Sequence, residues 1–110
     1  KSFARQPRDV DDKYAFRFRG YINIPRDGVY RFFTNSDDGS RLWIGEELVV
    51  DNDGLHSASE KSGVIALAAG THFFTVAMFE KSGGDELQVM WEGPGIRKEE
   101  VPWGVLCRDP

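Results

Sequence analysis

The feature that most constrains this chain is an alternation of apolar and polar residues, interrupted repeatedly by glycine-containing turns. Successive side chains of a strand point to opposite faces of a sheet, so this alternation buries one face and leaves the other in water. Over residues 14–24, Phe16 and Phe18 alternate with Arg17 and Arg19. No segment carries a sustained apolar stripe of helical period. The pattern predicts an antiparallel all-β fold, a β-sandwich or jelly-roll-like barrel.

Short polar turns separate the predicted strands. Glycine accepts positive φ angles and proline presets one φ angle, so the turns at 25–28, 45–47 and 69–70 are predicted hairpins. A further turn is expected at 82–85, and a long polar loop at 51–63. After residue 95 the chain is expected to be irregular, with Val101, Trp103, Val105 and Leu106 docking back on the sandwich. The predicted strands cover residues 14–24, 29–34, 42–44, 48–50, 64–68, 71–79 and 86–91.

Composition narrows the classes of protein that remain. The 110 residues suffice for one domain with one hydrophobic core, so we expect a single domain over 1–110, cut from a larger protein and monomeric in isolation. The net charge of −4, with both signs interspersed, argues against a nucleic-acid partner. No apolar stretch approaches the ~18 residues of a membrane-spanning helix. Cys107 is the single cysteine and cannot form an internal disulfide.

One segment carries a family resemblance. Residues 28–45, GVYRFFTNSDDGSRLWIG, resemble the core signature of the protective-antigen (PA-fourteen) domain family: a strand, an Asp-Asp-Gly loop, a second strand and a glycine hairpin. Further segments match in the same order, so the resemblance covers about residues 13–95. It implies a β-sandwich that does no chemistry itself, binds carbohydrate, and is extracellular, at the cell surface or periplasmic. The further matching segments are 49–56, 67–72, 80–87 and 89–91.

The resemblance also implies a ligand site at Asp37 and Asp38. In the fungal adhesins of the family, two adjacent aspartates joined by a cis peptide hold a calcium ion that contacts the sugar. A cis bond shortens the Cα–Cα distance from about 3.8 to about 2.9 Å, which turns both carboxylates to one side. That geometry costs about 3–4 kcal/mol, and the paired carboxylates repel each other unless a cation lies between them. Calcium takes six to eight oxygen ligands, so a bound ion would offset both the cost of the cis bond and the repulsion of the carboxylates. It is the cofactor that the resemblance implies.

A second interpretation of these aspartates stays open. Asp37, Asp38 and Gly39 also fit an ordinary turn, in which Asp37 bonds its own backbone. The adhesin site takes an additional Asn ligand from a late loop, whereas the corresponding region here has no Asn and contains a lysine that could neutralise the pair without metal. The predicted carbohydrate-binding residues are Asp37, Asp38, Gly39, Ser40, Lys81 and Asp85, and the predicted calcium ligands are Asp37 and Asp38.

No arrangement of residues predicts catalysis. His56 and His72 fall on different segments, which argues against a zinc site. We interpret His56 as a residue that braces its loop through a hydrogen bond to Asp51. A glycosidase needs two carboxyl groups across a cleft, one with a raised pKa, whereas the adjacent pairs here are expected in solvated turns or termini. Nucleophile and phosphate-binding motifs are absent from the sequence. The adjacent pairs are Asp11–Asp12, Glu46–Glu47 and Glu99–Glu100.

Aromatic side chains offer a second route to a sugar, because an exposed ring can stack on the apolar face of a pyranose. Trp43, Trp91 and Trp103 lie in apolar runs and are predicted to pack in the core. Tyr21 falls on the polar side of its strand and is the aromatic predicted to be exposed.

Two functions are expected from these observations. The leading one is a non-catalytic carbohydrate-binding accessory domain of a secreted or surface glycoside-active protein, with a glycan or polysaccharide and a neighbouring catalytic domain as partners. The parent protein would then be a glycoside hydrolase. The alternative is a structural module that packs on a neighbouring catalytic domain and shapes it without touching free sugar.

Overall fold

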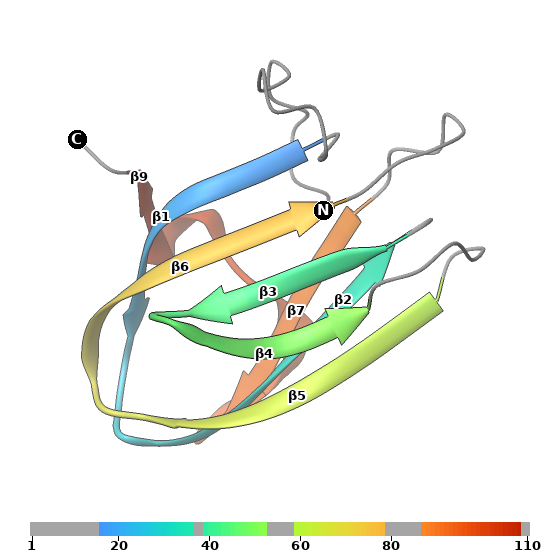
Figure 1. Cartoon of the computed structure of the whole chain (residues 1–110). Helices are drawn as coiled ribbons and strands as arrows, with labels where there is room; N and C mark the ends of the chain where they lie inside the picture. Colours follow the sequence, from blue (N-terminus) through green and yellow to red (C-terminus); the bar gives the residue numbers. More distant parts are fainter. Residues whose placement is uncertain (1–15, 37–38, 53–58, 79–86, 109–110) are drawn as a thin grey trace.

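The computed structural model describes residues 16–36, 39–52, 59–78 and 87–108, which form two antiparallel sheets packed face to face (Figure 1). The predicted all-β sandwich is confirmed. The elements of the described part are β1 (Phe16–Ile24), β2 (Gly28–Ser36), β3 (Ser40–Ile44), β4 (Glu47–Asn52), β5 (Ser59–Leu67), β6 (Gly70–Met78), β7 (Leu87–Gly93), β8 (Ile96–Glu100), the 3-10 helix η1 (Trp103–Val105) and β9 (Leu106–Arg108).

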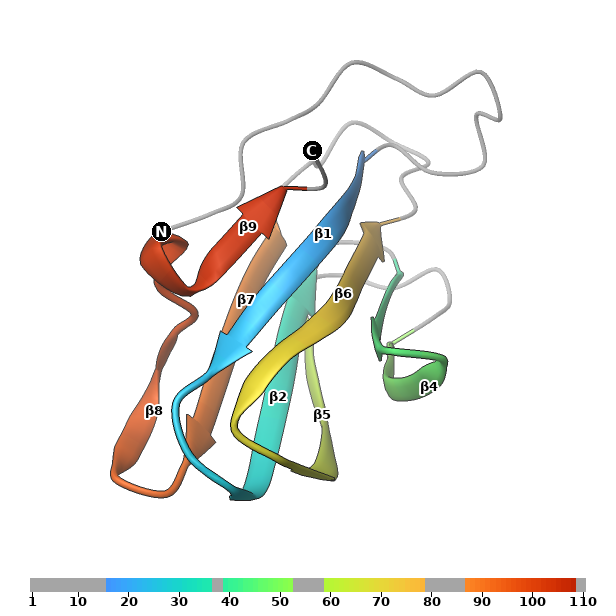
Figure 2. The same ribbon diagram turned by 90° about the vertical axis from the view of Figure 1, so that its left-hand side faces the viewer.

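The first layer, sheet A, has the strand order β4-β3-β6-β1-β9, and the second, sheet B, has the order β5-β2-β7-β8. Figure 2 shows β9, β1 and β6 in front of β7, β2 and β5. Only β3–β4 and β7–β8 are consecutive strands within one sheet, so six of the eight connections carry the chain from one sheet to the other. The chain therefore passes repeatedly between the two sheets along the described strands.

Two of the three predicted hairpins are wrong. The turn at 25–28 leads from β1 in sheet A to β2 in sheet B, and the turn at 69–70 leads from β5 back to β6. Glycine and proline reverse the chain locally, but they do not determine whether the next strand pairs with the last one. The turn at 45–47 is a hairpin as predicted, and Gly45 has a φ angle of 61° there.

The core lies between the sheets and is rich in aromatic rings. Tyr30 and Phe32 of β2 meet Trp91 of β7, with ring centroids 5.8 and 6.2 Å apart, and Phe32 also contacts Phe74 of β6 at 6.4 Å. Burying a side chain of this size contributes roughly 1.5–3 kcal/mol. The other large side chains of the core alternate along their strands as predicted: Phe18, Ile22, Ile24, Leu42, Ile44, Val50, Val76, Met78, Leu87 and Val89.

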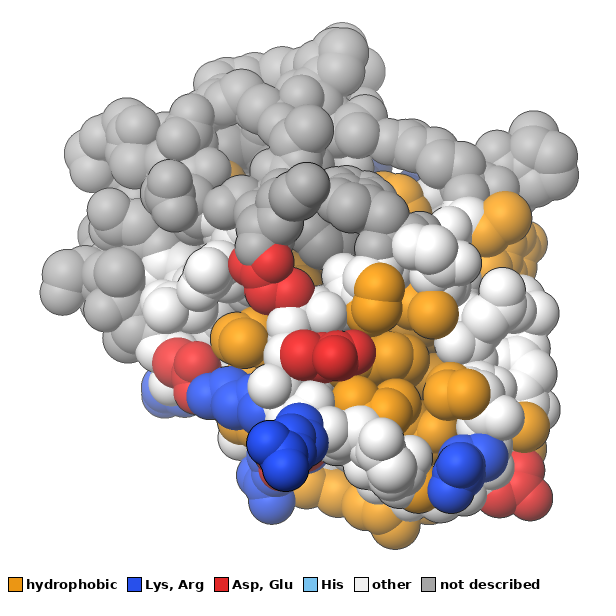
Figure 3. All heavy atoms as spheres, turned by 180° about the vertical axis from the view of Figure 1, so that it is seen from behind, with side chains coloured by type: hydrophobic (Ala, Val, Ile, Leu, Met, Phe, Trp, Pro, Cys, Tyr) orange, Lys and Arg blue, Asp and Glu red, His pale blue; other side chains and the backbone are white. Residues whose placement is uncertain are grey.

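The two long sides of the sandwich are closed differently. On one side β4 and β5 approach closely, and Gly63 of β5 lies against the backbone of Val49. On the other side β8 and β9 are the edge strands, and the segment between them crosses from sheet B to sheet A (Figure 2). Hydrophobic side chains gather on that side among charged ones (Figure 3), where Val105 and Leu106 are partly buried against the core. The expected docking of Val101 is also observed, because Val101 is buried.

Three other expectations from the sequence need correction. β5 begins at Ser59, inside the segment expected to be a loop, and the tail expected to be irregular forms β8 and β9. Trp43 was expected in the core, but it lies half-buried on the outer face of sheet A. Its neighbours Leu42 and Ile44 are buried, so the period of the strand turns Trp43 outward.

Candidate ligand-binding site

The end of the sandwich that carries the predicted acidic loop is formed by the termini of β1 to β7 (Figure 1). β2 ends at Ser36, which pairs with the first residues of β5 and β7. β3 begins at Ser40, which pairs with the last residues of β4 and β6. The described residues that flank segments 37–38, 53–58 and 79–86 therefore all lie at this end, although these segments are far apart in the sequence.

A buried polar cluster lies directly before and after residues 37–38. Thr34, Ser36, Ser40 and Asn52 are each at most 1% exposed. The Ser36 hydroxyl donates to Ser40 Oγ at 2.8 Å, and the Ser40 hydroxyl donates to Thr34 Oγ1 at 3.0 Å. Asn52 Nδ2 donates to the Thr34 carbonyl oxygen at 3.3 Å. Because buried polar groups are costly unless bonded, this cluster fixes the ends of β2, β3 and β4 relative to one another.

The predicted binding residues divide into two groups. Gly39 and Ser40 are described, and both are buried. The Ser40 hydroxyl is engaged by Ser36 and Thr34, so the structure gives Ser40 a bracing role beneath the loop. The remaining predicted residues lie outside the described part of the chain, as does the peptide bond expected to be cis. These remaining residues are Asp37, Asp38, Lys81 and Asp85.

Within the described ranges, no group of three or more His, Cys, Asp or Glu side chains is placed to hold a metal ion. His72 Nε2 lies 2.7 Å from the Ala68 carbonyl oxygen, where it braces the β5–β6 turn. Asp51 accepts a hydrogen bond from Arg41 Nε at 3.1 Å, whereas its predicted partner His56 lies outside the described residues. These side chains are engaged in structural contacts.

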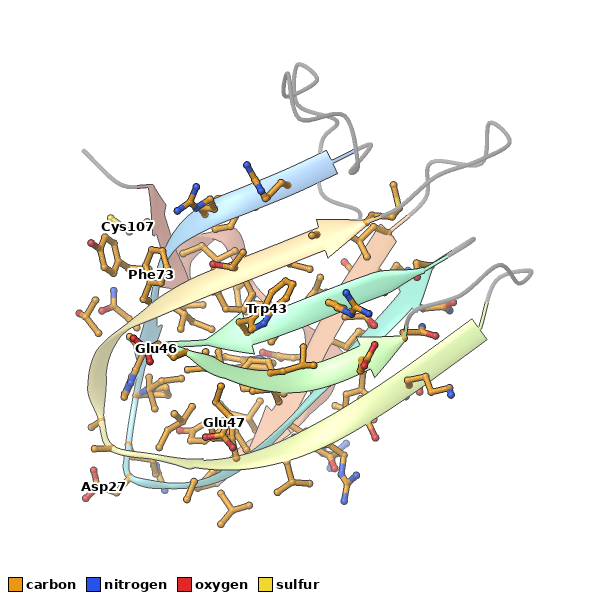
Figure 4. The ribbon with its side chains drawn as sticks, viewed as in Figure 1. Asp27, Trp43, Glu46, Glu47, Phe73 and Cys107 are labelled. Atoms are coloured by element: carbon orange, nitrogen blue, oxygen red, sulfur yellow. The ribbon has the colours of Figure 1, made fainter. Side chains whose placement is uncertain are left out.

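The carboxylate pairs also differ in their surroundings. Glu46, in the β3–β4 turn, and Glu47, at the start of β4, are both exposed, as expected (Figure 4). Glu99 was expected in a solvated turn or terminus, but it lies on β8, where its Oε2 accepts a hydrogen bond from Trp91 Nε1 at 2.9 Å. Glu99 thereby satisfies the polar atom of a core tryptophan, which is a structural role.

One groove opens on the outer face of sheet B, with a volume of about 310 Å³. Val29 and Val64 are 59% and 48% exposed in its wall, and Arg31 Nε lies 3.7 Å from Glu92 Oε2 across it. It lies toward the opposite end of β2 from the predicted acidic loop. A single exposed ion pair between valines provides no acid–base pair or nucleophile. The lining residues are Val29, Arg31, Val64, Glu92, Gly93 and Ile96.

The outer face of sheet A carries three aromatic side chains. Of these, Tyr21 was predicted to be exposed, whereas Trp43 was predicted to lie in the core. Tyr21 of β1, Phe73 of β6 and Trp43 of β3 are half-buried and belong to three neighbouring strands. The Tyr21 and Phe73 rings are 5.7 Å apart at 63°. We call these three residues the aromatic row. Figure 4 labels Phe73 on β6 and Trp43 on β3, and Cys107 of β9 pairs with Tyr21 on the other side of β1.

Comparison with known proteins identifies the family to which this fold belongs. The profile of the PA14 domain family matches residues 5–103. The chain belongs to the PA14 domain family. A solved PA14 domain, described as a sugar-binding domain from an RTX adhesin, superposes with a TM-score of 0.74 at 20% identity, over 84% of this chain and 53% of that chain. That likeness concerns the fold.

Relatives with higher sequence identity are regulators. This PA14 domain is 30% identical over 96 residues to anti-sigma-I factor RsgI3 of Acetivibrio thermocellus, over 86% of this chain and 15% of that protein. A solved anti-sigma factor domain-containing protein matches with a TM-score of 0.79 at 29% identity, over 84% of this chain and 33% of that chain. Another, from Clostridium clariflavum, has a TM-score of 0.72 at 30% identity, with 89% and 35% covered. The PA14 domain thus spans a minor part of each relative.

These relatives correct the expected function. The expectation of an accessory domain in a glycoside-active protein is wrong, because the proteins that match at about 30% identity are anti-sigma factors. The alternative of a module shaping a catalytic domain is corrected by the same finding. Within the described residues, no helix has the length and apolar character needed to cross a bilayer.

Proposed function

We propose that this PA14 domain is the ligand-recognition domain of an anti-sigma-factor-type regulatory protein and that it works outside the cytoplasm. The observation that carries the proposal is the identity of about 30% to anti-sigma factors over most of the domain. A regulator that holds a sigma factor needs a separate domain to receive its signal. A β-sandwich whose described residues supply no catalytic group set is suited to recognition without turnover.

The ligand class that we propose is a saccharide. The adhesin neighbour named as a sugar-binding domain supports this class, since it shares the fold of the chain. A saccharide outside the cell is also a signal that a regulator could report without importing it. Recognition by a shallow polar surface is expected to be weak, because bound water must be displaced from both partners.

We place a first binding surface at the end where the termini of β1 to β7 meet. Asp37, Asp38, Lys81 and Asp85 remain the proposed contacts there, with calcium held by the two aspartates. Support comes from the hydrogen bonds of Ser36 and Ser40, which anchor both sides of the acidic pair. A fixed base favours binding because less conformational entropy is lost when the ligand is bound.

Calcium binding can be measured on the isolated domain by isothermal titration. The unchanged chain should bind calcium, and Asp38→Ala should abolish the heat, because one carboxylate alone supplies too few of the six to eight oxygens that calcium takes. Glu46→Ala, which removes an exposed carboxylate in the β3–β4 turn, is the matched control and should leave the heat unchanged. Equal heats for Asp38→Ala and the unchanged chain would remove calcium from the proposal.

The regulatory role is tested in the parent protein. A reporter for the sigma-factor-dependent promoter is compared in cells that carry the intact parent and in cells whose parent lacks this domain. Addition of the saccharide should raise the reporter signal with the intact parent and leave it at the repressed level without the domain. A parent carrying Gly104→Ala in the domain is the control for general disturbance. An equal response of the intact and domain-deleted parents would refute the proposed function.

A further inference from the structure

The aromatic row lies on the outer face of sheet A, where Leu48 of β4, which pairs with Trp43 and is 42% exposed, continues the apolar line. Trp43 lies one strand and two residues from Phe73, a diagonal separation of about 7–8 Å between neighbouring strands. With Tyr21 beside Phe73 at 5.7 Å, the rings form a line that crosses β1, β6 and β3. A line of half-buried rings across three strands can contact a ligand that is extended, with several apolar surfaces in succession.

The indole of Trp43 differs from that of Trp91 in a way that points to a ligand. Trp91 is buried, and its Nε1 donates to Glu99 at 2.9 Å. In the part of the chain that the structure describes, no atom accepts a hydrogen bond from Nε1 of Trp43. Trp43 thus presents an apolar ring together with a free donor at the surface, which is the combination found where an aromatic residue recognises an amphipathic ligand.

Polar side chains border the rings on both sides. Arg19 of β1 and Trp43 of β3 are both paired with Thr75 of β6, on its two sides. On the other side, Thr71 Oγ1 donates to Asn23 Oδ1 at 2.9 Å, which leaves the Asn23 Nδ2 group as an outward donor. Guanidinium and amide N–H groups bind oxygen acceptors, so the border of the aromatic row complements a ligand rich in oxygen.

The charge of this face supports the same conclusion. Arginines occupy positions 17, 19 and 41 on the outward side of sheet A, although the chain as a whole has a net charge of −4. Asp51 of β4 lies on the same face and forms an ion pair with Arg41, with 3.1 Å between Asp51 Oδ1 and Arg41 Nε. The Arg19 guanidinium of this face therefore complements hydroxyl or carboxylate oxygens of a ligand.

We propose that the aromatic row binds an extended polysaccharide chain. The apolar faces of successive pyranose rings stack on Tyr21, Phe73 and Trp43, and ring oxygens and substituents accept hydrogen bonds from Arg19, Asn23 and Trp43 Nε1. The hydrogen-bond donors that border this narrow row, the Arg19 guanidinium and the Asn23 amide, favour a hydroxylated chain over the broad apolar centre of a protein interface. Neutral and uronate-containing polysaccharides share this chemistry, and the Arg19 guanidinium can bind the oxygens of either.

This surface is distinct from the acidic loop, so it stands whether or not calcium binds there. It shares the saccharide ligand with the proposed function but does not depend on a role in sigma-factor regulation. Asp38→Ala should leave polysaccharide binding to the aromatic row unchanged. Loss of the reporter response with intact binding in vitro would count against the regulatory role alone.

Binding is measured by affinity electrophoresis of the domain in gels that contain a neutral or a uronate-containing polysaccharide. Trp43→Ala should weaken retardation about tenfold, equivalent to ~1.4 kcal/mol, and Trp43→Phe should restore part of it. Val64→Ala, an exposed change on sheet B, is the matched control and should bind normally. If binding falls steeply with salt, the ligand is the acidic polymer, and if it does not, the neutral one. Unchanged retardation of Trp43→Ala in both gels would overturn the proposal.

A spectroscopic measurement on the unchanged chain guards against misfolding of a variant. In ¹H–¹⁵N correlation spectra, the indole N–H signal of Trp43, assigned from Trp43→Phe, should shift as polysaccharide is added. The signal of Trp91, which is buried and bonded to Glu99, should stay in place. A polysaccharide that binds without moving the Trp43 signal would place its site elsewhere and contradict the proposal.

Discussion

Gly63 shows how one residue determines the closure of the sandwich. It lies on β5, opposite Phe32 of β2 in sheet B, and its backbone lies against Val49 of β4 in sheet A. A Cβ atom at this position would overlap the Val49 carbonyl oxygen, so any side chain would push the sheets apart along this side. The requirement comes from close packing and not from a special φ angle, which is why the sequence alone does not reveal it.

Gly63→Ala is therefore expected to lower the free energy of unfolding by about 1–3 kcal/mol, the usual cost of forcing extra volume into a packed region. Urea unfolding followed by fluorescence measures the change. Gly104→Ala is the matched control, because an added Cβ there meets no atom within 4 Å, and it should shift stability by less than ~0.5 kcal/mol. Equal stability of the two variants would show that β4 and β5 are not in close contact.

The three tryptophans show what residue-level reasoning could and could not predict. Hydrophobicity placed Trp43 and Trp91 alike in the core, but only Trp91 is there. The signal that separates them was present in the sequence: Trp43 stands between Leu42 and Ile44, and period two cannot bury all three. The side chain of Trp103 lies outside the described residues.

At the scale of elements, the two turns mistaken for hairpins lie together and secure the end opposite the acidic loop. Asp27 Oδ1, in the β1–β2 turn, accepts a hydrogen bond from the Ala69 backbone N–H of the β5–β6 turn at 2.8 Å. The Tyr30 hydroxyl also donates to the Arg26 carbonyl oxygen at 2.7 Å. Both turns cross between sheets, so these bonds hold the layers together at a point where no strand ladder does.

Tyr30→Phe should lower stability by about 0.5–1.5 kcal/mol, because it removes the bond to Arg26 and keeps the ring against Trp91. The change is read from chemical unfolding curves. Tyr21→Phe is the control, since no described residue accepts a hydrogen bond from the Tyr21 hydroxyl, and it should be near neutral. If both variants lose the same amount, the β1–β2 turn does not depend on the Tyr30 hydroxyl.

At the scale of the whole molecule, the path of the chain couples the two sheets. Six of the eight connections between the described strands pass from one sheet to the other, and the aromatic core is shared between the layers. Neither sheet can separate without unfolding most of the other. This interweaving also brings the flanks of three distant segments to one end of the sandwich.

Unfolding should therefore be a single cooperative transition. In urea, the fluorescence of Trp43 in sheet A and of Trp91 in sheet B, each isolated by Phe substitutions at the other two tryptophans (Trp103 included), should follow the far-UV circular dichroism of the same variant. Coincident midpoints are expected within each variant. Separate midpoints for fluorescence and dichroism would mean that one sheet unfolds first.

Much of the fold follows from the sequence by itself. Alternation along β1, β2, β3, β6 and β7 determined which side chains face the core, because side-chain direction in a strand depends only on local geometry. The order of motifs from residue 28 onward predicted the family, which the match over residues 5–103 confirms. The acidic pair Asp37–Asp38 stays a prediction.

Only the tertiary structure decided which strands pair, where the layers touch and which surfaces gather side chains from several strands. Pairing depends on contacts between segments far apart in the chain, and local turn residues do not encode it. For this reason the sequence placed a hairpin at 25–28, where the structure has a crossing. The aromatic row likewise joins Tyr21, Phe73 and Trp43 through the order β1-β6-β3, which a linear pattern cannot show.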